Sequence, residues 1–175
     1  LPMSVDEIQR YGLWFRHDFF TKPFINDHVL DKIFGEHAQE IRLNYLRSIH
    51  DGLYEMLPQY DTQRKVEKAF AGKTDEKSNG LREGLYSLIS DVLFIPDRKN
   101  PNMYHPRIAV QFDFVYEALT WEEKEAFNRL YNDYYYRRHN DFWYHEAMKK
   151  LPCLIGATRM LVCGEDLGMV PGCVE

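Results

Sequence analysis

The sequence MLVCGEDLGMVP, at residues 160–171, carries a short apolar run that ends abruptly in two adjacent acids. A run rich in Leu and Val is typical of a buried β-strand, and Gly164 ends it before Glu165 and Asp166. Parallel α/β barrels build their active sites at the C-terminal tips of such strands. The residues alone leave two interpretations of equal weight: the acids line a catalytic cleft, or they cap a following helix.

The composition describes an ordinary globular chain. Its 175 residues are 45% hydrophobic and 28% charged, which predicts a single core and is too polar for a membrane span. Lys and Arg total 22 against 27 acids, so no basic surface for nucleic acid is expected. Cys153, Cys163 and Cys173 form no CxxC pair. Free thiols in a reducing compartment, and hence a cytoplasmic location, are the expectation.

Two capping boxes mark helices at opposite ends of the sequence. The stretch SVDE at residues 4–7 predicts a short helix that ends at Gly12. The stretch TWEE at residues 120–123 starts the longest predicted helix, which runs toward Asn140. Between them, spacing predicts a packed aromatic connector at 13–20, two helices within 26–56, and helices at 61–70 and 81–90.

The middle of the chain predicts a loop and a β-hairpin. Residues 71–80, AGKTDEKSNG, contain no large apolar side chain, so we expect a flexible solvated loop. Apolar runs at 92–95 and 107–112 flank a turn-forming segment and predict a hairpin at about 91–113. Pro106 then needs an edge position, because proline donates no ladder hydrogen bond.

An aromatic and basic cluster, YYYRRHNDFW, occupies residues 134–143. It is either a platform for stacking sugars or helix core with arginines reaching past it, and the core is the favoured interpretation. His139 and His145 are six residues apart, which is wrong for metal binding on one helix face. With no phosphate-binding glycine loop either, we expect neither a metal nor a cofactor.

Several motifs carry a resemblance to a known family. The segment at 151–174, with GEDLG at its centre, resembles the acid/base motif of the 4-alpha-glucanotransferases, the amylomaltase or disproportionating-enzyme family (glycoside hydrolase family 77). Further similar stretches are LPMSVDEIQRYG at 1–12, DGLYEMLPQYDTQRK at 51–65, YHPRI at 104–108 and NRLYNDYYYRRHNDFW at 128–143. They resemble the larger subtype, in which a helical segment is inserted in the catalytic barrel.

The resemblance implies a fold and a reaction. The expected fold is mainly α with a short β-hairpin: residues 1–150 form the helical insert, and residues 151–175 form one strand and loop of an incomplete (β/α)8 barrel. The implied reaction is a retaining transfer of α-1,4-glucan segments, with maltooligosaccharide or another α-glucan as substrate. Glu165 matches the general acid/base. Asp166 and Trp143 are the further candidates for substrate binding.

The family's other catalytic groups are absent from this sequence. A retaining mechanism needs a nucleophile about 5 Å from the acid/base, and the 175 residues contain no arginine-preceded RIDH-type motif. We therefore expect an internal fragment of a larger enzyme, inactive on its own. One alternative is an autonomous helical module that binds glucan or protein through Trp14, Trp121, Trp143 and the tyrosine run at 134–136. Another is an α-glucan hydrolase, because hydrolysis proceeds through the same glycosyl-enzyme.

Overall fold

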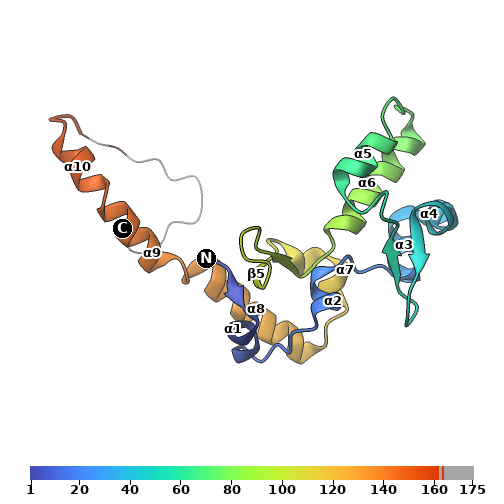
Figure 1. Ribbon diagram of the computed structural model, residues 1–175, viewed down its shortest axis with the longest axis horizontal. Coiled ribbons are helices and arrows are strands. Elements are labelled where there is room, and N and C mark those ends of the chain that lie inside the picture. The colour runs from blue at the N-terminus through green and yellow to red at the C-terminus, as the bar shows by residue number, and fades with distance from the viewer. Residues whose placement is uncertain (162, 164–175) are drawn as a thin grey trace.

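Two hydrophobic clusters organise the computed structural model, which describes residues 1–161 and 163 (Figure 1). Buried side chains within 3–20 and 93–134 form the first cluster, and those within 25–88 form the second. Where the chain leaves the first region, the Phe24 amide donates to the Asp91 carbonyl at 3.0 Å. Where the chain returns, the Leu93 amide donates to the Phe20 carbonyl at 2.9 Å. Residues 25–90 thus form a continuous segment inserted between the two parts of the chain that build the first cluster.

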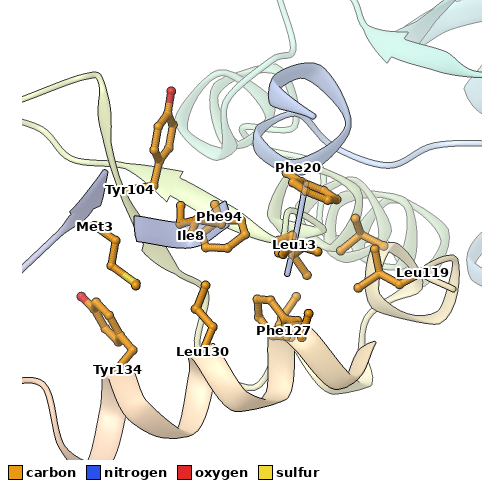
Figure 2. Close-up of a cluster of buried hydrophobic side chains, with 14 residues drawn as sticks. Met3, Ile8, Leu13, Phe20, Phe94, Tyr104, Leu119, Phe127, Leu130 and Tyr134 are labelled. Atoms are coloured by element: carbon orange, nitrogen blue, oxygen red, sulfur yellow. The ribbon is translucent and has the colours of Figure 1, made fainter. Parts of the chain in front are cut away.

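The first cluster packs one long helix against a small antiparallel sheet whose strand order is β1-β5-β4 (Figure 2). Phe127, Leu130 and Tyr134 face this core from the long helix, at the spacing of one helical face. Phe94 meets Phe127 edge to face, with ring centroids 5.7 Å apart. The elements are β1 (Met3–Ser4), α1 (Val5–Arg10), α2 (His17–Thr21), β4 (Phe94–Pro96), β5 (Met103–Pro106), η2 (Val110–Phe112), α7 (Phe114–Glu117) and α8 (Trp121–Tyr136).

Both predicted capping boxes are confirmed. The Ser4 hydroxyl accepts from the Glu7 amide at the start of α1, and Thr120 does the same for Glu123 at the start of α8. Gly12 has a φ of 92°, as a residue ending a helix in the left-handed region requires. Helix α8 ends at Tyr136, earlier than predicted, and a separate helix α9 (Asn140–Met148) follows.

The second cluster consists of four helices and a second hairpin. The two predicted helices within 26–56 are α3 and α4, but the segment ends in strands β2 and β3, which the sequence analysis missed. Their turn contains Asp51 and Gly52, both at positive φ, and Asp-Gly is a strong hairpin signal. The elements are α3 (Asp27–Phe34), η1 (Gly35–His37), α4 (Ala38–Tyr45), β2 (Leu46–Ser48), β3 (Tyr54–Met56), α5 (Gln63–Ala69) and α6 (Glu76–Ser90).

The expected loop at 71–80 is mostly wrong. Helix α6 already begins at Glu76, because the Asp75 carboxylate accepts from the Ser78 amide and caps it. The loop shrinks to the residues between α5 and Asp75, and the positions from 76 to 80 are the exposed or half-buried first turn of a helix. Polar composition alone could not separate a solvated loop from a solvated helix turn.

The hairpin at 91–113 is confirmed, but its second strand lies earlier than predicted. Strand β5 covers Met103–Pro106, and Pro106 pairs with Phe94. The other neighbour, β1, reaches only Met103 and Tyr104, so Pro106 has a strand on one side alone, as its missing amide requires. The expected strand at 107–112 contains instead a left-handed Ala109 and the 3₁₀ turn η2.

Beyond α8 the chain continues as an arm of two helices, α9 and α10 (Leu151–Gly156), that extends away from both clusters (Figure 1). Neither helix buries a residue. We expected a barrel strand near residue 160, but the described residues of the predicted 160–171 segment form none. Met160 is 78% exposed there, and Leu161 is 89% exposed. A barrel strand needs a neighbouring strand for its backbone hydrogen bonds, and the described residues supply none there. The fold is mainly helical with small antiparallel sheets.

Candidate functional site

The predicted catalytic stretch is described only at its beginning. Glu165 and Asp166 lie outside the described residues. Trp143 is on α9, where its side chain is 56% exposed and meets the Phe142 ring edge at 6.0 Å between centroids. Of the three predicted site residues, the structure therefore describes Trp143 alone, as an exposed aromatic side chain on the arm.

The aromatic cluster at 134–143 divides into two halves. Tyr134 is buried in the first cluster, and the Tyr135 hydroxyl donates to the Pro106 carbonyl at 2.6 Å. Burial raises the pKa of Tyr135 to about 12. The core interpretation is right for these residues and wrong for Phe142 and Trp143, which are exposed. The break falls where α8 ends, because the arm no longer faces the sheet.

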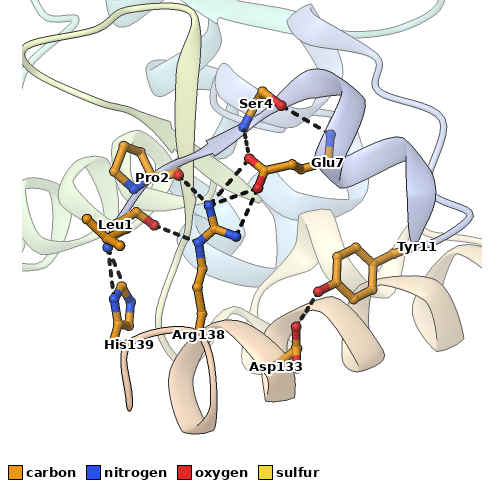
Figure 3. Close-up of polar contacts among 8 residues, drawn as sticks. All are labelled: Leu1, Pro2, Ser4, Glu7, Tyr11, Asp133, Arg138 and His139. Carbon is orange, nitrogen blue, oxygen red and sulfur yellow. Dashed lines mark hydrogen bonds and ion pairs between the residues drawn. The ribbon is translucent and has the colours of Figure 1, made fainter. Parts of the chain in front are cut away.

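Arg138 fixes the start of the arm to the N-terminal segment (Figure 3). Its guanidinium pairs with the Glu7 carboxylate at 3.1 Å and donates to the Pro2 carbonyl at 2.8 Å. Although burial opposes the change, hydrogen bonds from Ser4 and Arg138 lower the pKa of Glu7. Glu7 also closes the capping box of α1, so one carboxylate joins helix α1 to the end of α8.

A second polar cluster holds the tip of the β4–β5 hairpin against α8. The His105 ring contacts the Tyr134 hydroxyl through Nδ1 at 2.6 Å and the Asp97 carboxylate through Nε2 at 2.9 Å. The other oxygen of Asp97 accepts from the amides of Lys99 and Asn100 in the turn. This cluster has a structural role, because each group is used to hold the turn on the helix.

A cavity of about 790 Å³ lies between α2 and the β2–β3 hairpin. This volume is within the roughly 300–1,000 Å³ range typical of ligand sites. One wall is the segment at residues 16–25, here called the connector, which contains α2 and joins the two clusters. The β2–β3 hairpin and its turn form the other wall. The lining residues are Arg16, His17, Asp18, Phe19, Lys22, Pro23, Phe24, Ile25, Arg47, Ile49, His50, Leu53, Tyr54, Glu55, Met56, Pro58 and Asp61.

No pattern in the sequence indicated this cavity, because its walls come from two segments that meet only in the folded chain. Phe24 packs against both hydrophobic clusters and fixes the connector. The hairpin is attached to the connector by backbone bonding, since the Tyr54 amide donates to the Ile25 carbonyl at 2.9 Å. The Asp51-Gly52 turn is the signal that could have predicted the hairpin wall.

Within the described residues, no group of three or more His, Cys, Asp or Glu side chains is arranged to hold a metal ion. The same part of the chain contains no helix with the length and apolarity to cross a membrane.

The comparisons place the chain in a family. The family model for 4-alpha-glucanotransferases matches residues 23–175, and the chain belongs to this family. The chain is also 30% identical over 180 aligned residues to the 4-alpha-glucanotransferase DPE2 of Oryza sativa subsp. japonica. That alignment covers 100% of this chain and 19% of the rice protein, so the chain spans about a fifth of its relative. No solved structure matches the chain.

Proposed function

We propose that these residues are part of a larger 4-alpha-glucanotransferase that moves α-1,4-glucan segments from one glucan to a sugar hydroxyl of another. The observation that carries this proposal is the family match, which extends over residues 23–175 and includes the GEDLG motif. The alignment of this whole chain with 19% of the rice enzyme supports it. The substrate class is accordingly an α-glucan or maltooligosaccharide.

In this proposal Glu165 is the general acid/base of a retaining double displacement. As a carboxylic acid it protonates the glycosidic oxygen while a nucleophilic carboxylate attacks the anomeric carbon, which forms a glycosyl-enzyme and releases the shortened glucan. As a carboxylate it then takes the proton of the acceptor hydroxyl, which attacks the same carbon and frees the nucleophile. The nucleophile comes from a part of the enzyme outside these 175 residues.

The remaining residues have supporting roles in the proposal. Asp166 follows Glu165 directly, and on an extended strand adjacent side chains point to opposite faces. It therefore supports the site without transferring the proton. Trp143 offers an exposed ring that can stack on a sugar. Residues 1–150 are the helical insert that leads to the acid/base motif.

The test is maltotriose disproportionation by the full-length enzyme. General acid/base groups contribute about 10²- to 10⁴-fold to rate, so Glu165→Gln is expected to lower kcat by that factor. Asp166→Asn is the matched control at the adjacent carboxylate and is expected to lower kcat less. Proton NMR should show products with the α configuration and little free glucose beyond the transfer products. Undiminished turnover by Glu165→Gln contradicts the assignment, and release of one reducing end per cleavage indicates a hydrolase.

The isolated chain, residues 1–175, is expected to have no transferase activity, because it contributes the acid/base without the nucleophile. Circular dichroism on the same sample checks that it is folded. Redistribution of maltotriose by the isolated chain contradicts this part of the proposal.

A second candidate function is an autonomous module that binds glucan or protein. The observation that favours it is the exposure of Trp14 and Trp121, at 73% and 72%. Under this hypothesis the isolated, folded chain binds maltoheptaose measurably by calorimetry, and replacing these tryptophans with alanine removes the binding. A folded chain with no affinity for glucan or for protein partners counts against it.

A further inference from the structure

The cavity between α2 and the β2–β3 hairpin is lined by charged side chains that are all already paired. Lys22 pairs with Asp18 at 2.9 Å within one wall, and Arg47 pairs with Glu55 across the two strands of the other. The remaining two charged residues are paired with partners outside the lining: Arg16 with Glu123 at 2.7 Å, and Asp61 with Lys65 at 2.6 Å.

The ion pairs in the lining indicate what net charge a ligand of this cavity carries. Three cations and three carboxylates line the cavity, and each has an opposite charge at contact distance. A phosphate or other anion would meet no uncommitted cation and would face carboxylates as well, which costs free energy. The arrangement fits a neutral ligand. Paired charges still leave donor and acceptor sites, since a guanidinium has five N–H donors and a carboxylate about four lone-pair sites.

The rest of the lining is largely apolar. Phe19 and Phe24 meet edge to face at 5.3 Å between centroids, and the Arg16 guanidinium covers the Phe19 ring at 4.2 Å. On the facing wall Ile49 is partly exposed beside the cavity. A pyranose ring matches such walls, because it presents C–H groups on its faces and hydroxyl groups around its edge. Each hydroxyl both donates and accepts, as the paired side chains require.

We infer that this cavity binds a neutral oligosaccharide chain, in which the sugar rings contact Phe24 and Ile49 and the hydroxyls contact the Arg47–Glu55 pair. It is a binding surface built by the insert itself, between the connector and the β2–β3 hairpin. The identification of the sugar as an α-1,4-glucan rests on the proposed function.

The test is hydrogen–deuterium exchange on the full-length enzyme carrying Glu165→Gln, with maltoheptaose as the probe, because this variant is expected to consume the sugar about 10²- to 10⁴-fold more slowly. Maltoheptaose is expected to slow amide exchange in the peptides that cover residues 46–58. Inorganic phosphate at the same concentration is expected to leave them unchanged. Slowed exchange with phosphate and none with maltoheptaose overturns the inference.

Two variants locate the effect. Ile49→Arg places a bulky unpaired cation in the cavity, and Ile108→Arg is the matched control, since Ile108 is exposed and does not line the cavity. The cavity variant is expected to lose the protection at 46–58, whereas the control keeps it. The double variant Arg47→Met with Glu55→Gln removes the guanidinium donors and the carboxylate charge without changing the net charge. It is expected to weaken maltoheptaose binding by about 10-fold, and unchanged thermal unfolding shows that it is folded.

The outcomes separate this inference from the proposed function. If the wild-type enzyme transfers glucose units but maltoheptaose leaves exchange at 46–58 unchanged, the cavity inference is wrong and the proposed function stands. If residues 46–58 are protected but the wild-type enzyme transfers nothing, the proposed function fails and the oligosaccharide site remains. Equal loss of protection in Ile49→Arg and Ile108→Arg also overturns the inference.

Discussion

Gly84 lies on the face of α6 that packs directly against α3. A Cβ atom placed on it would lie 2.8 Å from Phe34 Cζ and 3.0 Å from Ile33 Cγ2. Phe34 is buried and cannot swing into solvent. Gly84→Ala is therefore expected to lower the free energy of unfolding by about 1 to 3 kcal/mol through overpacking, as measured by urea denaturation.

Gly80, one turn earlier in the same helix, is the matched control. A Cβ there meets nothing within 4 Å. Gly80→Ala is expected to raise the free energy of unfolding by about 0.4 to 1 kcal/mol, because alanine loses less backbone entropy on folding. A stabilising Gly84→Ala would show that α6 and α3 are not packed as described.

Asp91 is a buried carboxyl group where the chain returns from the second cluster. Its oxygens accept from the amides of Val115 at 2.9 Å and Phe114 at 3.1 Å, at the start of α7. Burial raises the pKa of Asp91 to about 6, and the Asp113 carboxylate acts in the same direction. The hydrogen bonds from the two backbone amides and the charge of Arg107 lower the pKa of Asp91, but they do not cancel the rise caused by burial.

The raised pKa predicts how stability changes with pH. The folded chain holds this proton more tightly than the unfolded chain, whose aspartates titrate near pH 4. The contribution of Asp91 is therefore fully present below about pH 4 and is lost as pH rises through about 6. Urea denaturation of wild type and Asp91→Asn between pH 4 and 7 measures this difference. The variant should lose less stability over that interval, and parallel pH profiles contradict the assignment.

At the scale of elements, local capping signals mark the starts of α1 and α8. Thr120 caps α8, the longest helix, and its hydroxyl accepts from the Glu123 amide at 3.2 Å. Thr120→Ala is expected to lower the free energy of unfolding by about 1 kcal/mol, within the 0.5–2 range for such caps. Thr74→Ala, at an exposed position before α6, is the control and should change stability little. Equal effects of the two substitutions on the denaturation midpoint would contradict a capping role.

Capping boxes were predictable because both partners lie within four residues. The ends of the strands and their pairing partners were harder to predict from the sequence. Pro106 could join β5 only because β1 pairs with Met103 and Tyr104 and goes no further along β5, and the length of a neighbouring strand cannot be read from the local sequence. The start of α6 at Glu76 is a different case, because its Asp75 cap is a local signal that the polar composition of residues 71–80 obscured.

For the whole molecule, the arm of α9 and α10 adds no packing to either cluster. Leu154→Ser and Ile155→Ser, at exposed positions of α10, are expected to change the free energy of unfolding of this chain by no more than about 0.5 kcal/mol. Leu85→Ala, fully buried in the second cluster, is expected to cost about 2 to 5 kcal/mol. Urea denaturation of the three variants measures the change in the free energy of unfolding at the arm positions and at Leu85. A cost above 1 kcal/mol at the arm positions would show that α10 packs on the rest of the chain.

The sequence by itself determined the starts of α1 and α8, the positive φ of Gly12 and the family, because capping boxes, glycine and the GEDLG motif are read from neighbouring residues. It also predicted Glu165 as the candidate acid/base, through a motif that needs no tertiary contact to be recognised. Only the tertiary structure decided where the cavity lies and that its charges are neutralised. Arg16 finds Glu123 at a separation of 107 residues, and the connector meets the β2–β3 hairpin through Ile25 and Tyr54. Such contacts form when two hydrophobic clusters bury their apolar surface, a global requirement that no local pattern encodes.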